Sequence, residues 1–163
     1  RSVVTSGGRG AMGCGLPAAV GATFGAPERT VWMFTGDGGF QMNIQELGTI
    51  MENQCPVKVI LMNNNYLGNV RQWQDMFFGQ RKSFTRMLNP HYQLIADAYH
   101  IPYEVVIDRK DLKAAIEKML ATDGPFILEC AVKEEDNVAP MIAPGASIDE
   151  MMLEINIETK LDC

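Results

Sequence analysis

The 163-residue sequence lacks the features of several large classes of protein. No apolar run approaches the length needed to cross a membrane, and no secretory signal peptide opens the chain. Positive charge is scarce, because 14 Lys and Arg stand against 20 Asp and Glu, for a net charge of -6. An acidic chain of this kind is a poor partner for nucleic acid. We therefore expect neither a membrane nor a nucleic acid as partner.

Paired cysteines and clustered histidines are missing as well. The four cysteines lie far apart, which favours neither a zinc site nor a disulfide framework, and reduced cytoplasmic thiols are the default expectation. The two histidines each stand alone at an expected element end, so we assign neither a catalytic role. These residues are Cys14, Cys55, Cys130, Cys163, His91 and His100.

The composition that remains is ordinary for a globular domain, with 47% hydrophobic and 21% charged residues. The chain begins with Arg1 rather than Met, and we interpret residues 1–163 as one C-terminal domain of a longer polypeptide. After Lys133 the sequence becomes acidic and is broken by prolines. Residues 133–163 are therefore predicted to form an exposed C-terminal tail.

Two strands and the helix between them are predicted to bring two polar residues together. Residues 31–34 and 57–62 are short apolar runs without helical period, as buried strands are. Residues 40–51 between them carry apolar side chains at helical spacing. Such a unit makes a right-handed crossover between parallel strands. Asp37 and Asn64, which follow the two strands, should therefore lie at the same edge of one sheet.

The oxygens of Asp37 and Asn64 suit a hard cation such as magnesium or calcium, with coordination positions left for water or phosphate oxygens. Gly38 and Gly39 let a ligand approach the backbone, and the helix that starts there points N–H groups at any anion. Residues 36–39 alone, or residues 63–65 alone, would be better explained as a polar turn. Because both stretches follow successive strand ends, together they indicate a metal-bridged diphosphate site.

These residues resemble a known motif, since residues 36–38 read GDG and residues 63–64 read NN. Enzymes that depend on thiamine diphosphate carry this pair of sequences. The resemblance implies that Asp37, Asn64 and the main-chain carbonyl of Tyr66 hold Mg²⁺ against the diphosphate. The further cofactor contacts that it implies are Gly36, Gly38, Gly39, Leu67 and Gly68.

A glycine-rich stretch, TSGGRGAMGCGLPAA, occupies residues 5–19 and leads into a helix of small residues. Gly8, Gly10 and Gly13 spell GxGxxG, but only residues 2–4 could supply the strand that should precede this fingerprint. We therefore reject the Rossmann interpretation. A flexible entry loop before a tightly packed helix is the simplest alternative.

The same stretch resembles a segment of the acetohydroxyacid synthases, also called acetolactate synthases, with Arg9 and Ala11 in place of the usual Leu and Thr. The resemblance implies that the Gly10 backbone bonds the aminopyrimidine of the cofactor and that Met12 lies beneath the cofactor. Without it, a methionine here would be interpreted as core filling.

Residues 65–78 form an amphipathic pattern with Val70, Trp73 and Phe77 on one face, which usually indicates a core face. The segment also resembles the YLGMVxQWQ stretch of the same family, with Asn69 in place of its methionine. The resemblance places Trp73 at the pocket of the second ketoacid. The tail resembles the family's NVxPMxxPG segment, which folds over the active site.

The remaining elements predicted from the pattern are helices at residues 92–99 and 111–121, the second capped by Asp111, and strands at 103–107 and 126–132. The implied fold class is α/β, a mainly parallel sheet with helices on both faces and the cofactor at its carboxyl edge.

The function implied by the resemblance is that of an acetolactate synthase, which decarboxylates pyruvate and condenses the product with a second pyruvate or with 2-ketobutyrate, for branched-chain amino acid synthesis. It implies thiamine diphosphate and Mg²⁺ as cofactors, with FAD only in the full-length enzyme, a homodimer or homotetramer, and a possible regulatory small subunit. The pyrimidine-binding domain, with its activating glutamate, and the FAD domain would lie outside this sequence, so no catalytic residue is expected in it.

Two alternatives stay open. Another thiamine diphosphate-dependent 2-ketoacid decarboxylase, or a separately encoded diphosphate-binding subunit, could share the metal motif without needing residues 72–74 or the tail. A binding module without activity is the second alternative.

Overall fold

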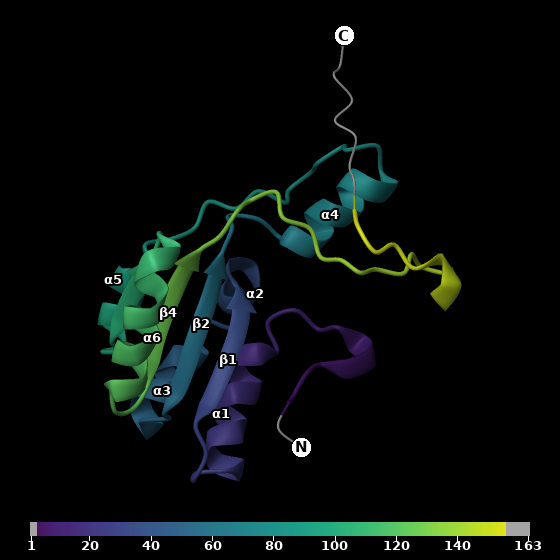
Figure 1. Ribbon diagram of the computed structural model, residues 1–163. Coiled ribbons are helices and arrows are strands. Elements are labelled where there is room, and N and C mark those ends of the chain that lie inside the picture. Colours follow the sequence, from purple (N-terminus) through teal and green to yellow (C-terminus); the bar gives the residue numbers. More distant parts are fainter. Residues whose placement is uncertain (1–2, 156–163) are drawn as a thin grey trace. The chain divides into compact units, whose positions relative to one another are not determined.

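The computed structural model describes residues 3–155, which form two compact units. The first unit contains residues 3–65 and 88–132, and the second contains residues 66–87 and 133–155 (Figure 1). Residues 1–2 and the last eight residues of the predicted tail, with Cys163 among them, lie outside the described residues. The helices and strands are α1 (Gly15–Gly25), β1 (Val31–Gly36), α2 (Asp37–Met42), α3 (Glu46–Asn53), β2 (Val57–Asn63), α4 (Gly68–Phe77), α5 (Tyr92–Ala98), β3 (Tyr103–Val106), α6 (Leu112–Ala121) and β4 (Phe126–Ala131).

A four-stranded sheet forms the centre of the first unit, with strand order β1-β2-β4-β3 and every pairing parallel. The register sets Gly36 opposite Met62, so β1 and β2 end at the same edge. The predicted crossover between these strands is thus confirmed. The edge at which β1 and β2 end is called the carboxyl edge below.

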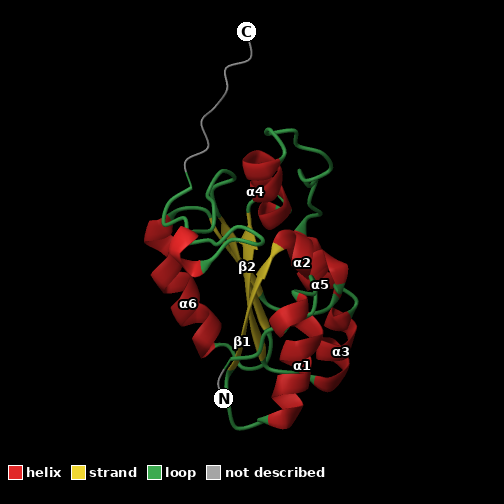
Figure 2. Cartoon of the chain, turned by 90° about the vertical axis from the view of Figure 1, so that its right-hand side faces the viewer, coloured by secondary structure: helices red, strands yellow, loops and turns green. Residues whose placement is uncertain are grey.

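Helices cover both faces of the sheet (Figure 2). On one face, α1, α3 and α5 contribute Leu16, Leu47 and Ala96 to a core that includes Leu61 of β2. On the other face, α6 packs Met119 against β2 and β4. The first five residues of β2 are all buried, which explains why this strand reads as a continuous apolar run. The predicted α/β fold class is confirmed.

The helix predicted over residues 40–51 is instead two helices, α2 and α3, separated by residues 43–45. Asn43 leaves the helical conformation at φ -135° and ψ 33°. Its side-chain Nδ2 donates to the Gly13 carbonyl oxygen at 2.9 Å. A side-chain amide that bonds to backbone elsewhere offers the chain an alternative to the helical ladder. This contact, which the helical periodicity does not encode, accompanies the break.

The predicted cap of α6 is also different. Asp111 stands at the N-cap position but makes no side-chain capping bond. Asp108 accepts from the backbone N–H of Lys110 at 3.0 Å instead, because a 3₁₀ turn, Arg109–Asp111, precedes the helix.

No helix in residues 3–155 is long and apolar enough to span a membrane.

Candidate functional site

The carboxylate of Asp37 is the most deeply buried polar group at the carboxyl edge. Asp37 is the first residue of α2, directly after β1, and only 1% of it is exposed. Its Oδ1 accepts from the backbone N–H of Gly38 at 3.0 Å, and its Oδ2 accepts from Nδ2 of Asn89 at 2.7 Å. The backbone of α2 and the side chain of Asn89 therefore fix the direction of the carboxylate.

The turn that follows β2 lies next to this carboxylate. Asn63 ends the strand, and its Oδ1 accepts from the backbone N–H of Asn65 at 3.1 Å and from Asn89 Nδ2 at 2.9 Å. Asn65, at φ 57°, also accepts from Asn89 at 3.2 Å. Asn64 lies between these two residues and is half-buried. Asp37 and the turn that contains Asn64 are thus brought together, as the crossover predicts.

A second layer of polar groups supports this turn from β4 and β3. Nδ2 of Asn63 donates to Glu129 Oε1 at 2.7 Å, and the hydroxyl of Tyr103 donates to Glu129 Oε2. Burial and the neighbouring carboxylate raise the pKa of Tyr103, so its hydroxyl stays protonated and remains a donor. The orientation of the Asn63 carboxamide is therefore set from both ends.

The groups that surround the Asp37 carboxylate decide whether this site suits a cation. Burial raises the pKa of this carboxyl, although hydrogen bonds from Asn89 and Gly38 oppose the rise. All of these donors are neutral, and none of the ion pairs recorded in residues 3–155 involves Asp37. A buried carboxylate surrounded by neutral donors and amide oxygens is a suitable environment for a hard divalent cation. The same described residues contain no cluster of three His, Cys, Asp or Glu that could hold a metal.

The glycine-rich loop contacts this part of the first unit. The Gly13 carbonyl binds Asn43, and the Gly39 carbonyl oxygen lies 3.5 Å from where a Cβ on Gly13 would sit. Gly10 is exposed at φ 57°, and Met12 is 50% exposed. Core filling therefore does not describe Met12, whereas its predicted place beneath the cofactor stays a prediction.

Replacing Gly13 with Ala should destabilise the protein by at least about 2 kcal/mol. Its φ of 83° is unfavourable for a residue with a Cβ, and that atom would stand 2.7 Å from Asn43 Nδ2 and 2.8 Å from Met42 Cβ. Gly21, in the middle of α1, has nothing within 4 Å. Gly21→Ala is the matched control and should stabilise by about 0.5–1 kcal/mol. Urea unfolding of both variants measures the difference, and equal effects would contradict the expectation.

The second unit is built on α4, whose buried side chains are polar. Arg71 and Gln72 are 3% and 2% exposed. Arg71 Nη2 donates to the Asp136 carbonyl and to Asn137 Oδ1, both at 3.0 Å. Gln72 donates to the Val138 carbonyl at 3.1 Å and accepts from the Val138 N–H at 2.7 Å. The beginning of the predicted tail is therefore clamped to α4 by side chains that the helical pattern did not single out.

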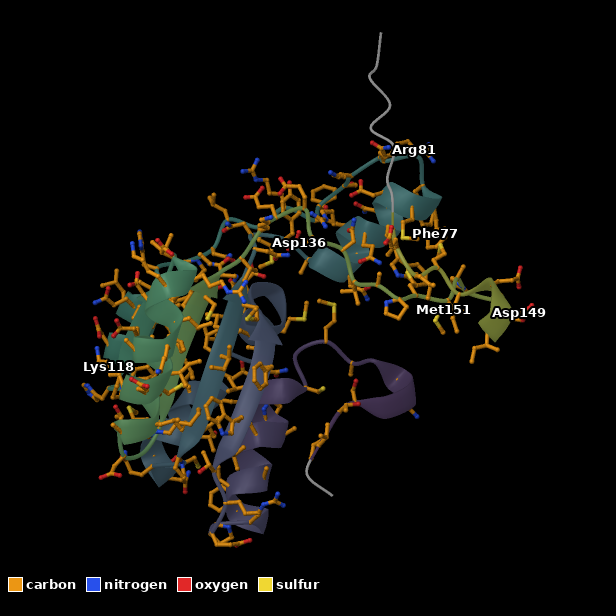
Figure 3. All side chains as sticks on the ribbon, viewed as in Figure 1. Phe77, Arg81, Lys118, Asp136, Asp149 and Met151 are labelled. Carbon is orange, nitrogen blue, oxygen red and sulfur yellow. The ribbon has the colours of Figure 1, made fainter. Side chains whose placement is uncertain are left out.

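The opposite side of α4 carries the aromatic residues and is open. Trp73 is 38% exposed and packs edge-to-face on Phe77, with ring centroids 5.5 Å apart. Figure 3 labels Phe77 on α4 and Arg81 in the loop beyond it. A pocket of about 560 Å³ is lined by Asn69, Val70, Trp73, Gln74, Phe78 and Arg81. Trp73 and Asn69 thus lie in the wall of a pocket.

Three of the predicted cofactor contacts belong to the second unit. Tyr66 forms an isolated bridge with Arg86, and its ring lies 5.5 Å from the guanidinium carbon of Arg71. The Leu67 N–H donates to the Thr85 carbonyl at 2.8 Å, and Gly68 begins α4. Their roles toward the metal and the cofactor stay predictions.

Comparison with known proteins places these residues in a family. Residues 1–130 match the family described as "Thiamine pyrophosphate enzyme, C-terminal TPP binding domain". The large subunit of acetolactate synthase isozyme 2 from Escherichia coli is 44% identical over 154 residues, which cover 94% of this chain and 28% of that protein. Chloroplastic acetolactate synthase 2 from Nicotiana tabacum is 43% identical over 162 residues, which cover 94% of this chain and 24% of that protein.

A solved structure agrees with the fold. The thiamine diphosphate-dependent 4-hydroxybenzoylformate decarboxylase from Rhodococcus jostii RHA1 matches with a TM-score of 0.73 and 27% identity, over 79% of this chain and 24% of that one. The chain spans about a quarter of the length of the relatives that it matches. From the matched family and the 44% identity, the chain belongs to the thiamine pyrophosphate enzymes, as their C-terminal cofactor-binding domain.

Proposed function

We propose that this chain is the diphosphate- and magnesium-binding domain of an acetolactate synthase. The observation that carries the proposal is the meeting of the Asp37 carboxylate with the turn that contains Asn64, in a chain 44% identical to an acetolactate synthase over most of its length. The proposed substrates are one pyruvate, which is decarboxylated, and a second ketoacid, which is either pyruvate or 2-ketobutyrate. Bound thiamine diphosphate would supply the electron sink that a 2-ketoacid needs to lose carbon dioxide.

The residues of this chain would bind and orient. Asp37, Asn64 and the Tyr66 carbonyl are proposed to hold Mg²⁺, with the charge of Asp37 balancing that of the cation. Gly10 and Met12 are proposed to contact the aminopyrimidine end of the cofactor, and Trp73 to line the pocket of the second ketoacid. The contacts proposed for the diphosphate end are Gly36, Gly38, Gly39, Leu67 and Gly68.

The wider assembly also belongs to the proposal. A cytoplasmic homodimer or homotetramer, FAD in the full-length enzyme and a regulatory small subunit are all proposed. The name of the Escherichia coli relative, a large subunit, supports the last of these. The free cysteines in the described part of the chain support a reducing compartment.

A decarboxylase is the second candidate, favoured by the similarity to the Rhodococcus jostii enzyme. That enzyme shares 27% identity with this chain, whereas the acetolactate synthases share more than 40%. The stretch Gln72-Trp73-Gln74 and the clamped tail also favour the acetolactate synthase, because a decarboxylase needs no acceptor pocket.

The full-length gene product should form acetolactate from pyruvate when supplied with thiamine diphosphate and Mg²⁺. Residues 1–163 alone should show no turnover, because the two carboxylates described at the carboxyl edge are already engaged: Asp37 is assigned to the metal, and Glu129 accepts from Asn63 and Tyr103. Product analysis of both proteins is the measurement. Aldehyde and carbon dioxide without acetolactate would identify a decarboxylase, no turnover by the full-length product would favour a binding module, and turnover by the short chain would contradict the assignment.

A further inference from the structure

The side chain of Asn89 joins three oxygen atoms that belong to different parts of the carboxyl edge. Its Nδ2 lies 2.7 Å from Asp37 Oδ2, 2.9 Å from Asn63 Oδ1 and 3.2 Å from Asn65 Oδ1. A carboxamide nitrogen carries two hydrogens, so three acceptors share two donors. One neutral group thus spans the end of β1 and the turn after β2.

The other end of the carboxamide is also held. Oδ1 of Asn89 accepts from Nε2 of Gln41 at 2.7 Å, and the same nitrogen lies 3.2 Å from the hydroxyl of Tyr92. Turning the carboxamide over would set its oxygen against the Asp37 carboxylate. The donor of Gln41 and the three acceptor oxygens therefore favour the same orientation of the Asn89 carboxamide.

Asn89 differs from a metal ligand in what it offers. Its nitrogen is a donor, and its oxygen is already engaged by Gln41. As a neutral donor it draws Asp37 and the asparagine turn together, although their oxygens would otherwise repel one another. A Lys or Arg in the same place would neutralise Asp37, whereas Asn89 leaves the whole negative charge to attract a cation.

We propose that Asn89 is a positioning residue for the divalent cation, holding Asp37 and the turn of Asn63–Asn65 at the spacing that the cation requires. The inference rests on the proposed function, since it concerns the Mg²⁺ assigned there to Asp37 and Asn64. Groups that orient metal ligands commonly change metal affinity by 10–100-fold when they are removed.

The test uses the full-length gene product with thiamine diphosphate, and titrates Mn²⁺ followed by electron paramagnetic resonance. Asn89→Ala should bind Mn²⁺ about tenfold more weakly. The Mg²⁺ concentration for half-maximal activity should rise by the same factor, while kcat at saturating Mg²⁺ changes little. Asn89→Gln keeps the carboxamide but sets it one methylene further out, so its affinity for Mn²⁺ should fall only several-fold. This variant provides a readout if the Ala variant does not fold.

Asn53→Ala is the matched control, because its exposed carboxamide donates to the Thr49 carbonyl within α3. This variant should bind Mn²⁺ as the wild type does. Unchanged or tighter binding in both Asn89 variants would overturn the inference and leave the proposed function intact. Absence of Mn²⁺ binding in the wild type would overturn both.

Discussion

Replacing Asp37 with Ala in the full-length protein should weaken binding of Mg²⁺ and thiamine diphosphate by at least a hundredfold, or about 2.8 kcal/mol. Asp37 is the only charged group in the proposed ligand set, and the other members contribute amide or carbonyl dipoles. Its burial strengthens its attraction for a cation, because little solvent screens the charge. Calorimetric titration with both ligands measures the loss.

Asp37→Asn separates the charge of this residue from its shape. Burial raises the pKa of Asp37, so the ionised form costs free energy in the metal-free fold. The Asn variant removes this cost but replaces one of the two acceptor oxygens with an NH₂ group that meets a donor, either Asn89 Nδ2 or the Gly38 N–H, so without metal it should melt close to the wild type. It should still bind Mg²⁺ poorly. Asp97→Ala, on the exposed side of α5, is the control for loss of a carboxylate elsewhere. Normal Mg²⁺ affinity in both Asp37 variants would refute the assignment.

Replacing Trp73 with Leu should change the choice between 2-ketobutyrate and pyruvate by roughly 10–200-fold, because a pocket wall discriminates one methylene by about 1–3 kcal/mol. Trp73 and Phe77 present rigid faces beside the pocket, and Leu would leave the wall shorter and more mobile. Competition between the two ketoacids, with acetolactate and acetohydroxybutyrate quantified together, gives the ratio directly. Cofactor binding should stay unchanged.

The second tryptophan offers a closely matched control. Trp32, on β1, is also 38% exposed, yet it lies in the first unit and does not line the pocket. Trp32→Leu should leave the product ratio as it is. An unaltered ratio in Trp73→Leu together with a lowered melting temperature would mean that Trp73 supports the fold of the second unit rather than specificity.

The elements whose residues follow a regular pattern could be predicted from the sequence. Period and apolar runs located β1, β2 and β4, and the crossover rule set the first two side by side with Asp37 and Asn64 at one edge. Contacts between distant residues could not be predicted. The break at Asn43 accompanies a bond to Gly13, thirty positions away.

Asn89 was missed for a related reason. Asn directly before Pro is typical of a turn, and the three oxygens that bind its side chain come from residues 24 to 52 positions earlier. Arg71 and Gln72 were missed because a helical pattern assigns apolar residues to the buried side, whereas α4 buries two polar ones. Their partners, residues 136–138, follow more than sixty positions later.

The parallel pairing of β2 with β4 also bears on the order in which the chain assembles. The Val132 N–H donates to the Asn63 carbonyl at 2.9 Å. The sheet therefore holds together the ends of β2 and β4, after which the chain continues into the two segments of the second unit. Gln72 and Val138 are 66 positions apart along the chain. Once the strands have paired, the loop that remains to be closed is about 15 residues, which lowers the entropic cost of closure by roughly 1 kcal/mol. We therefore expect the clamp between α4 and the tail to form after the strands of the sheet have paired, and to be the first part to open.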